Sequence, residues 1–332
     1  MLSLSHYIVF FLFSCLGTGI FRQYAIKREL LDIPNKRSSH TSPTPRGGGI
    51  VFVVCFEVAL IAILRQHQIV TPWFIVIVTA SIVIAMIGLI DDLIGLSAIL
   101  RLTIQFLVAS MLVQSLSVMV FADFLFYPGI FLIKIIATLF IVWSINLFNF
   151  MDGIDGLASL QAISVCLGGA LLFFIEGDTP LLVFPLLLAT VVTGFLVWNF
   201  PKAKIFMGDA GSGFIGLFVA LFSLVAARDG SALFCAWLIL NAVFYLDATV
   251  TLFARIYYRK NILQGHCSHA YQHAAQRYGN HWVVGAGVFV VNCCWLLPLA
   301  IMVQKGIIPI WLGLLFGYLP LAGLVLSYKP GS

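Results

Sequence analysis

The sequence contains few charged residues. Lys, Arg, Asp and Glu together make up 9% of the 332 residues, whereas about 25% is usual for a soluble globular protein. Hydrophobic residues make up 61% of the chain. This composition excludes an ordinary soluble domain and predicts a polytopic membrane protein built from helices.

The sequence also lacks several other features. Its seven cysteines include no Cys-x-x-Cys pair and lie mostly within hydrophobic runs, which excludes a disulfide framework and a zinc ribbon. The first hydrophobic run, 2–21, has no small-residue cleavage site and is therefore expected to be a retained span. No internal repeat or low-complexity segment is present, and nothing indicates a nucleic acid partner, so we expect one domain over residues 1–332.

Long hydrophobic runs are what the sequence does have. A membrane-spanning helix needs about 20 mainly apolar residues. Eleven runs approach that length: 2–21, 47–64, 70–90, 102–121, 129–148, 157–175, 180–197, 213–227, 231–253, 282–303 and 307–327. The run 213–227 is short and bounded by glycine. The prediction is an all-α bundle of about eleven transmembrane helices, or ten.

The basic residues are divided unevenly between the two ends of these spans. Fourteen lie in loops that follow odd-numbered spans, and three lie in loops that follow even-numbered spans. Cytoplasmic loops are enriched in Lys and Arg, so the N-terminus is expected outside and the C-terminus inside. This orientation predicts five cytoplasmic loops: 22–46, 91–101, 149–156, 198–212 and 254–281.

Most of the carboxylates capable of chemistry lie in these cytoplasmic loops. Asp91 and Asp92 follow one span directly, Asp152 and Asp155 follow another, and Asp209 lies in the loop before the short run. Carboxylates are costly at the edge of the hydrocarbon, so a convergent set predicts a functional site. Two adjacent carboxylates at a helix C-terminus repel each other and meet the unfavourable end of the dipole, which favours a nearby cation over a solvated helix end.

The segment 149–156 has the densest polar pattern. Asn146, Asn149 and Asp152 are three residues apart, as are Asp152 and Asp155. On a helical turn this spacing places them on one face. Chemistry on a phosphorylated substrate, an ion or proton path through a transporter, and a purely structural role all remain open here.

The loop 198–212 combines a carboxylate with glycines, lysines and an aromatic ring. Asp209 can bind Mg²⁺, which prefers oxygen ligands and usually keeps waters and substrate phosphates in its coordination shell. Phe206 can stack on a base or anchor the loop in the membrane interface.

The last large inner loop contains His266, His269 and His273. The latter two are four residues apart and would share a helical face. Phosphate or sugar recognition, a solvated loop and a zinc site remain open, although no orderly fourth zinc ligand is present. The first inner loop, which contains Arg46, is basic and rich in turn residues, as is typical of a positive-inside anchor.

At these motifs the sequence resembles the polyprenyl-phosphate N-acetylhexosamine-1-phosphate transferases of glycosyl transferase family 4, relatives of phospho-MurNAc-pentapeptide translocase. Five motifs occur in the family order: 45–48, Asp91-Asp92, 149–156, 206–212 and 266–273. Residues 93–97 lack the Lys of the translocase branch, and the His motif is more similar to the branch that initiates O-antigen and related lipopolysaccharide synthesis.

The resemblance implies a reaction between undecaprenyl phosphate and a UDP-N-acetylhexosamine that gives lipid-pyrophosphoryl-sugar and UMP. It implies Mg²⁺ as cofactor, with Mn²⁺ as a substitute, in a multi-pass protein of the bacterial inner membrane whose active site faces the cytoplasm. Whether the chain forms a homodimer stays open. The implied roles are: catalytic, Asp91, Asp92 and Asp152; metal, Asp209 and Asp152; substrate-binding, Asn149, Asp155, Asn199, Phe206, His266, His269, His273, Arg101 and Arg46. An ion- or proton-coupled transporter is the alternative.

Overall fold

A computed structural model describes residues 2–34, 42–66, 72–120, 129–261 and 266–331, and parts of the predicted loops 22–46 and 254–281 and of the predicted spans 70–90 and 102–121 lie outside these residues. The described chain is a helix bundle with one two-stranded sheet, so the predicted all-α polytopic membrane architecture is confirmed. The elements are α1 (Leu4–Lys27), β1 (Leu31–Asp32), β2 (Thr44–Pro45), α2 (Gly49–Gln66), α3 (Pro72–Ile94), α4 (Ala98–Val120), α5 (Ile130–Phe150), α6 (Leu157–Glu176), α7 (Val183–Asn199), α8 (Asp209–Ala226), α9 (Ser231–Leu240), α10 (Ala242–Tyr257), α11 (Ala270–Tyr278), α12 (His281–Val291), the π-helix η2 (Asn292–Leu296), α13 (Leu297–Gln304) and α14 (Ile310–Ser327).

Helices lie in all eleven predicted spans, but they differ in length and continuity. Within the described residues, eight helices are long and apolar enough to cross a membrane. A ninth crossing results if α9 and α10 form one span, although α10 bends away from α9 by 71°. Helix α7 is apolar but has 17 residues and is therefore shorter than these eight candidate spans. The count of eleven and the orientation therefore stay predictions from the sequence.

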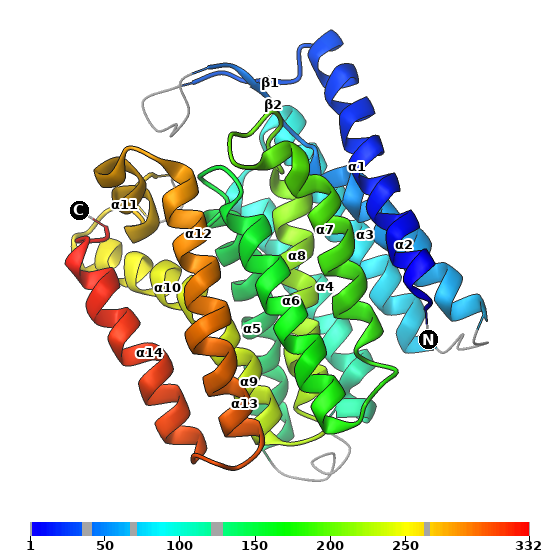
Figure 1. Ribbon diagram of the computed structural model, residues 1–332, viewed down its shortest axis with the longest axis vertical. Coiled ribbons are helices and arrows are strands. Elements are labelled where there is room, and N and C mark those ends of the chain that lie inside the picture. The colour runs from blue at the N-terminus through cyan, green and yellow to red at the C-terminus, as the bar shows by residue number, and fades with distance from the viewer. Residues whose placement is uncertain (1, 35–41, 67–71, 121–128, 262–265, 332) are drawn as a thin grey trace.

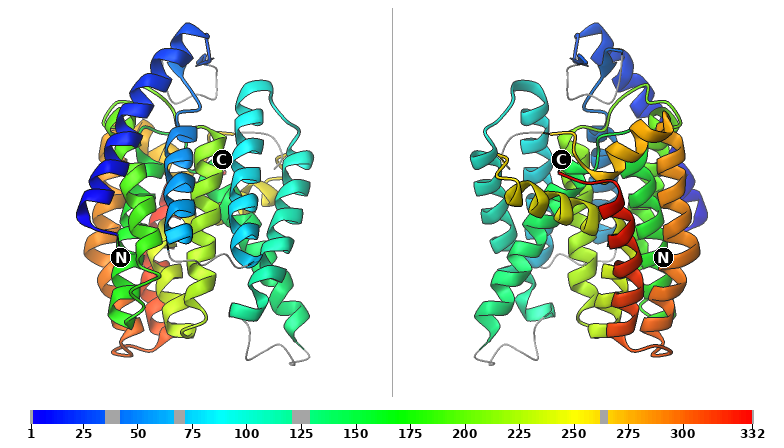
Figure 2. Two further views of the ribbon diagram at one scale, coloured as in Figure 1. Left: turned by 90° about the vertical axis from the view of Figure 1, so that its right-hand side faces the viewer. Right: turned by 90° about the vertical axis from the view of Figure 1, so that its left-hand side faces the viewer.

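The long helices run roughly side by side, with α1 and α14 at opposite edges of the bundle (Figures 1 and 2). Helix α8 lies inside and is the most buried of the candidate spans. It packs against α2, α3, α5 and α9. The short α11 lies at the upper left of the bundle beside the C-terminus, and α10 crosses the left side below it (Figure 1).

Glycines allow the neighbours of α8 to approach its backbone closely. A Cβ atom at Gly88 of α3 would lie 2.4 Å from the main-chain nitrogen of Ala210, and one at Gly216 of α8 would lie 2.4 Å from the carbonyl oxygen of Ser144. The Ser144 hydroxyl donates a hydrogen bond to the Gly216 carbonyl at 2.8 Å, which fixes α5 against α8. Helices α3, α5 and α8 therefore bring their polar ends together at one end of the bundle.

Helices extend into two of the predicted loops. Asp91 and Asp92 lie within the last turn of α3, and Asp209 is the first residue of α8. The helices thus reach several residues into the predicted loops 91–101 and 198–212. Helix α8 starts before its hydrophobic run because Gly208, with a φ angle of +79°, turns the chain directly into the helix at Asp209.

Candidate active site

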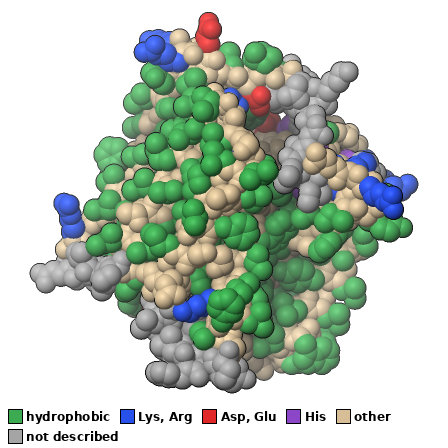
Figure 3. All heavy atoms as spheres, turned by 180° about the vertical axis from the view of Figure 1, so that it is seen from behind, with side chains coloured by type: hydrophobic (Ala, Val, Ile, Leu, Met, Phe, Trp, Pro, Cys, Tyr) green, Lys and Arg blue, Asp and Glu red, His purple; other side chains and the backbone are tan. Residues whose placement is uncertain are grey.

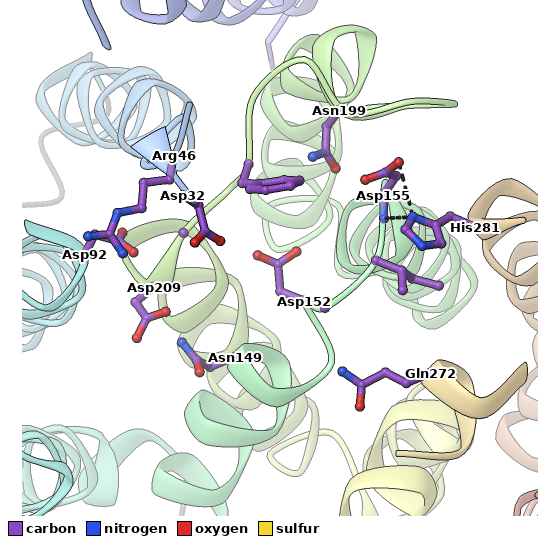
Figure 4. Close-up of a pocket in the computed structure, with 14 residues that line it drawn as sticks. Asp32, Arg46, Asp92, Asn149, Asp152, Asp155, Asn199, Asp209, Gln272 and His281 are labelled. Atoms are coloured by element: carbon purple, nitrogen blue, oxygen red, sulfur yellow. Dashed lines mark hydrogen bonds and ion pairs between the residues drawn. The ribbon is translucent and has the colours of Figure 1, made fainter. Parts of the chain in front are cut away.

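A polar cavity of about 270 Å³ opens at the end of the bundle where α3, α5 and α8 meet. Figure 3 shows acidic, basic and His side chains together in a hollow toward the upper end of one face, above a mostly hydrophobic flank. Figure 4 shows the carboxylates of Asp92, Asp152 and Asp209 around a common space. The lining residues are Asp32, Arg46, Asp92, Asn149, Asp152, Gly153, Ile154, Asp155, Asn199, Phe206, Gly208, Asp209, Gln272 and His281.

Asp92 reaches this cavity because it packs against the start of α8. A Cβ atom at Gly208 would lie 2.4 Å from Asp92 Oδ2, so only glycine leaves room for the carboxylate there. Asp92 is 8% exposed, and its carboxylate faces the main-chain N–H groups of Asp209 and Ala210 at the start of α8, although its Oδ2 makes no well-formed hydrogen bond among the described residues. A buried carboxylate oxygen left unpaired is costly unless a cation or a donor completes it.

Asp91 and Asp92, both predicted as catalytic residues, have different surroundings. Neighbouring residues on a helix point in different directions, and Asp91 does not line the polar cavity. Its Oδ1 accepts the Leu96 N–H at 2.5 Å, and its Oδ2 accepts from Arg101 Nη1 at 2.5 Å. The same Arg101 nitrogen lies 2.8 Å from Asp209 Oδ2. Asp91 therefore holds Arg101 against Asp209.

The segment after α5 is a turn rather than a helix. Helix α5 ends at Phe150, and residues 151–156 turn into α6, so the helical face predicted for Asp152 and Asp155 does not form. Both side chains nevertheless line the polar cavity. The Tyr271 hydroxyl holds this turn by donating to the Phe150 carbonyl at 2.9 Å, close to Gly153, where a Cβ atom would lie 2.1 Å from the Tyr271 oxygen.

Asp152 has a carboxyl whose pKa is raised well above its usual value. Burial makes the largest contribution, and the negative charges of Asp209, Asp92 and Asp155 add to it. Ionising these groups together is unfavourable without a compensating positive charge. The cluster is thus an environment that favours a bound cation.

Arg46 and Phe206 are brought into the cavity by pairing between two distant loops. The Phe206 N–H donates to the Pro45 carbonyl at 2.8 Å, and the Gly48 N–H donates to the Phe206 carbonyl at 2.9 Å. Strand pairing between β1 and β2 places Asp32 beside the same loop, with Asp32 opposite Thr44. Figure 4 shows Asp32 and Arg46 close to Asp92.

Asn199 lines the cavity, but both polar atoms of its side chain form hydrogen bonds with main-chain groups. Its Oδ1 accepts the Gly156 N–H at 3.0 Å, and its Nδ2 donates to the Ile205 carbonyl at 3.0 Å. The side chain is 3% exposed. Asn199 thus fixes the turn that carries Asp155 to the loop that carries Phe206.

A second and larger cavity adjoins the first. It has a volume of about 580 Å³ and is mostly apolar. Its lining residues are Ala98, Arg101, Leu102, Phe106, Leu139, Val142, Trp143, Asn146, Asn149, Phe150, Gly153, Leu252, His266, His269, Tyr271 and Gln272. Asn149, Gly153 and Gln272 line both cavities.

The three predicted histidines divide between two environments. His266 and His269 line the apolar cavity and stack with ring centroids 4.9 Å apart. Burial, with smaller contributions from His269, Arg255 and Lys260, lowers the pKa of His266 to about 4, so its imidazole is neutral at pH 7. His273 lines neither cavity, and its Nδ1 lies 2.7 Å from the Tyr328 carbonyl near the C-terminus. His269 and His273 were predicted to share a helical face, and this prediction is wrong. Helix α11 begins at Ala270, so His269 is its N-cap residue and lies outside the helix.

Asp247 of α10 fixes this histidine segment. Its carboxylate accepts the Ala270 N–H at 3.0 Å and the Tyr271 N–H at 2.9 Å, and it lies 3.4 Å from His269 Nδ1. The side chain is 3% exposed and also accepts the Thr251 hydroxyl at 3.0 Å. One buried carboxylate therefore holds the N-terminus of α11, which carries Tyr271 and Gln272 to the cavities.

Asp247→Asn is expected to loosen α11 without unfolding the bundle. Hydrogen bonds to a charged group contribute about 1.5–3 kcal/mol each, so amide protection in residues 266–278 should fall by roughly tenfold or more in hydrogen exchange. Thr251→Val is the matched control, because it removes only the hydroxyl bond. Equal protection in Asp247→Asn and Thr251→Val would contradict this role.

Asp32, Gln272 and His281 line the polar cavity but were not among the residues expected from sequence. His281 Nδ1 lies 3.2 Å from Asp155 Oδ2, and Gln272 Oε1 accepts the His269 N–H at 3.2 Å (Figure 4). Gln272 directly precedes His273, and His281 lies eight residues after His273. For these two residues, proximity to the His motif was the one signal in the sequence.

The part of the chain that the structure describes contains no group of three His, Cys, Asp or Glu side chains arranged to hold a metal by themselves. The described residues therefore do not form a structural zinc site or a metal site built from protein ligands alone. Mg²⁺ requires only one or two carboxylates when substrate phosphates and waters complete its shell. The unpaired Asp92 oxygen and the clustered carboxylates of Asp152 and Asp209 fit that kind of site.

Comparison with known proteins agrees with the resemblance at the motifs. The model of glycosyl transferase family 4 matches residues 74–227. Decaprenyl-phosphate N-acetylglucosaminephosphotransferase of Mycolicibacterium smegmatis is 34% identical over 72% of this chain and 66% of its own length. A probable undecaprenyl-phosphate N-acetylglucosaminyl 1-phosphate transferase of Bacillus subtilis is 30% identical over 79% of this chain and 74% of its own length.

Undecaprenyl-phosphate alpha-N-acetylglucosaminyl 1-phosphate transferase of Escherichia coli K12 is 30% identical over 75% of this chain and 70% of its own length. The chain thus spans just under two thirds of the mycobacterial relative and somewhat more of the other two. The transporter alternative finds no support in these relatives. The chain belongs to glycosyl transferase family 4.

Proposed function

We propose that this protein transfers N-acetylhexosamine-1-phosphate from a UDP-sugar to undecaprenyl phosphate and releases UMP. The observation that carries the proposal is the contact between two cavities of opposite character. One is lined by carboxylates and amides, the other is mostly apolar, and Asn149, Gly153 and Gln272 line both. A water-soluble anionic donor and a lipid acceptor have to meet at such a boundary.

The polar cavity is assigned to the donor. Asp209 and Asp152 would hold Mg²⁺, with Mn²⁺ as a substitute, while Phe206, Asn199 and Asp155 surround the nucleotide. The bound cation would screen the repulsion between the donor pyrophosphate and the acceptor phosphate and stabilise charge on the leaving UMP. Arg46 adds a positive side chain beside the donor phosphates.

The apolar cavity is assigned to the acceptor. Its aromatic and aliphatic lining, which includes Phe106, Leu139 and Trp143, suits a polyprenyl chain. Arg101 lies at the boundary and would face the lipid phosphate, and His266 and His269 would donate hydrogen bonds to phosphate or sugar.

The proposed reaction is a single displacement at the β-phosphorus of the donor, in which one P–O bond forms and one breaks. An oxygen of the lipid phosphate forms a bond to the β-phosphorus of the donor, and the bond from that phosphorus to the bridging oxygen breaks, so UMP leaves. The second pKa of a phosphomonoester is about 6, so the acceptor is largely dianionic at neutral pH. A strong general base is therefore unnecessary, and Asp92 would serve only to take the proton from the minor, monoanionic form of the acceptor phosphate.

The names of the relatives favour N-acetylglucosamine as the sugar. We place the reaction at the cytoplasmic face of a bacterial inner membrane, from the positive-inside pattern of the loops. The proposed biological role is the first step of O-antigen or related cell-envelope polysaccharide synthesis, and a homodimer remains a hypothesis.

A donor labelled separately in the sugar and in the β-phosphate tests the reaction type. Transfer of sugar-1-phosphate moves both labels into the undecaprenyl lipid and releases unlabelled UMP. If the sugar label alone enters the lipid and labelled UDP is released, the protein is a simple glycosyl transferase and the proposal is wrong.

The raised pKa of Asp152 predicts how pH and Mg²⁺ act on stability. The folded protein holds protons that the unfolded chain releases, so without a cation stability is greatest below the ordinary carboxyl pKa and falls as pH rises toward the raised value. Mg²⁺ binds the ionised carboxylates and should offset that loss. We expect Mg²⁺ to raise the melting temperature by roughly 5 °C at about pH 8 and much less at about pH 5.5.

Asp152→Asn is the matched variant for that experiment, because it keeps the shape of the side chain and removes its charge. Its melting temperature should respond less to both pH and Mg²⁺. An Mg²⁺ effect that is equal at the two pH values, or equal in Asp152→Asn, would contradict a cation site at these carboxylates.

A further inference from the structure

His281 makes two contacts with the same residue through one ring nitrogen. Its Nδ1 lies 3.2 Å from Asp155 Oδ2 and 3.4 Å from the Asp155 main-chain nitrogen (Figure 4). Both residues line the polar cavity. No motif considered in the sequence includes His281.

The two contacts require different states of the imidazole. A hydrogen bond to the carboxylate needs a proton on Nδ1, whereas acceptance of the Asp155 N–H needs a lone pair there. They are therefore alternatives rather than simultaneous bonds. In the first state His281 holds Asp155 Oδ2, and in the second it leaves the carboxylate to turn.

The surroundings fix the positions of both main chains. The Asn280 side chain caps α12 by accepting the Trp282 N–H at 3.2 Å, which places His281 in the first helical position. A Cβ atom at Gly285 would lie 3.0 Å from Leu160 Cδ1, so α12 packs closely on α6. On the other side, Asn199 holds the Gly156 N–H. The Asp155 carboxylate is the part that His281 can still orient.

We propose that His281 is a positioning residue for the donor nucleotide. With Nδ1 protonated, it binds Asp155 Oδ2 and leaves Oδ1 directed at the cavity to accept an N–H or O–H of the nucleoside. This deepens the proposed function and rests on it for the identity of the ligand. A carboxylate held in one orientation loses less conformational freedom when the ligand binds, so the contribution of His281 is to donor affinity.

The test compares His281→Asn with His281→Leu in the full-length protein. Asn carries an amide N–H close to the position of Nδ1 and should keep donor binding within about threefold of wild type. Leu has no donor and should raise the KM for the UDP-sugar by about tenfold, the effect of losing a hydrogen bond to a charged group. The kcat and the KM for undecaprenyl phosphate should change by less than about twofold.

Binding of labelled UDP, measured without acceptor lipid, separates this inference from the proposed reaction. Three results would support the positioning role even if no transfer is found. UDP should bind more weakly to His281→Leu, and binding should be restored in His281→Asn. Adding His281→Leu to Asp155→Asn should cause no further loss of UDP binding. Unchanged UDP binding in His281→Leu overturns it, as does equal damage by Asn and Leu. If wild-type protein transfers sugar phosphate while His281→Leu binds UDP normally, the inference alone is wrong.

Discussion

Asp209→Asn is expected to lower sugar-phosphate transfer by about 10³-fold while the protein stays folded. Asp209 lies at the start of α8, where it faces the cavity with Asp92 and Asp152 (Figure 4). Asn has the same shape and can still bind Arg101, but it supplies no charge to a cation. Losing one electrostatic contact to the transition state commonly costs about 10²–10³ in rate, and losing a proposed metal ligand should reach the upper end.

The measurement is label transfer into lipid at saturating donor, with the melting temperature recorded for the same preparation. Asp229→Asn is the control, because Asp229 lies in an ion pair with Arg228 away from both cavities. Exposed pairs contribute only about 0–1 kcal/mol, so that variant should turn over normally. Near-normal turnover of Asp209→Asn would remove Asp209 as a metal ligand.

Gly88→Ala is expected to damage both stability and activity although Gly88 does not line the polar cavity. The added methyl group would lie 2.4 Å from Ala210 N and from the carbonyl carbon of Asp209, which are main-chain atoms that cannot turn aside. Helix α3 must then move away from α8. Because Asp92 lies one turn further along α3, the movement separates it from Asp209 and Gly208.

Overpacking of this kind costs about 1–3 kcal/mol, and a shift of about 1 Å in a reacting group can cost about 10²-fold in rate. The melting temperature and the transfer rate of Gly88→Ala should both fall. Gly287→Ala is the matched control, since a Cβ atom there meets nothing within 4 Å. If Gly88→Ala behaves like Gly287→Ala, the close contact between α3 and α8 does not position the site.

Much of the fold could be predicted because hydrophobic runs and helices are set by the same local pattern. The clustering of Asp92, Asp152 and Asp209 also followed from the sequence, since each lies near the same end of its span. Helix ends were less predictable. The chain enters α8 at Asp209 through the turn at Gly208, a conformation that no hydrophobic pattern records.

Distinctions between neighbouring residues needed the structure. Asp91 and Asp92 are equivalent in sequence, but on α3 one faces Arg101 and the other faces α8. His273 belongs to the His motif by spacing, yet it binds the Tyr328 carbonyl because α14 returns to that end of the bundle. Asp32 reaches the cavity only through strand pairing, a long-range contact without a local signal.

The most direct measurement uses purified protein with Mg²⁺, undecaprenyl phosphate and a panel of radiolabelled UDP-N-acetylhexosamines. We expect that label enters the lipid, that UMP is released in equal amount, that EDTA stops the reaction and that UDP-N-acetylglucosamine is the best donor. Folded protein that transfers none of the sugars, or that transfers them equally well in EDTA, would contradict the assignment of the carboxylate cavity as a cation-dependent transferase site.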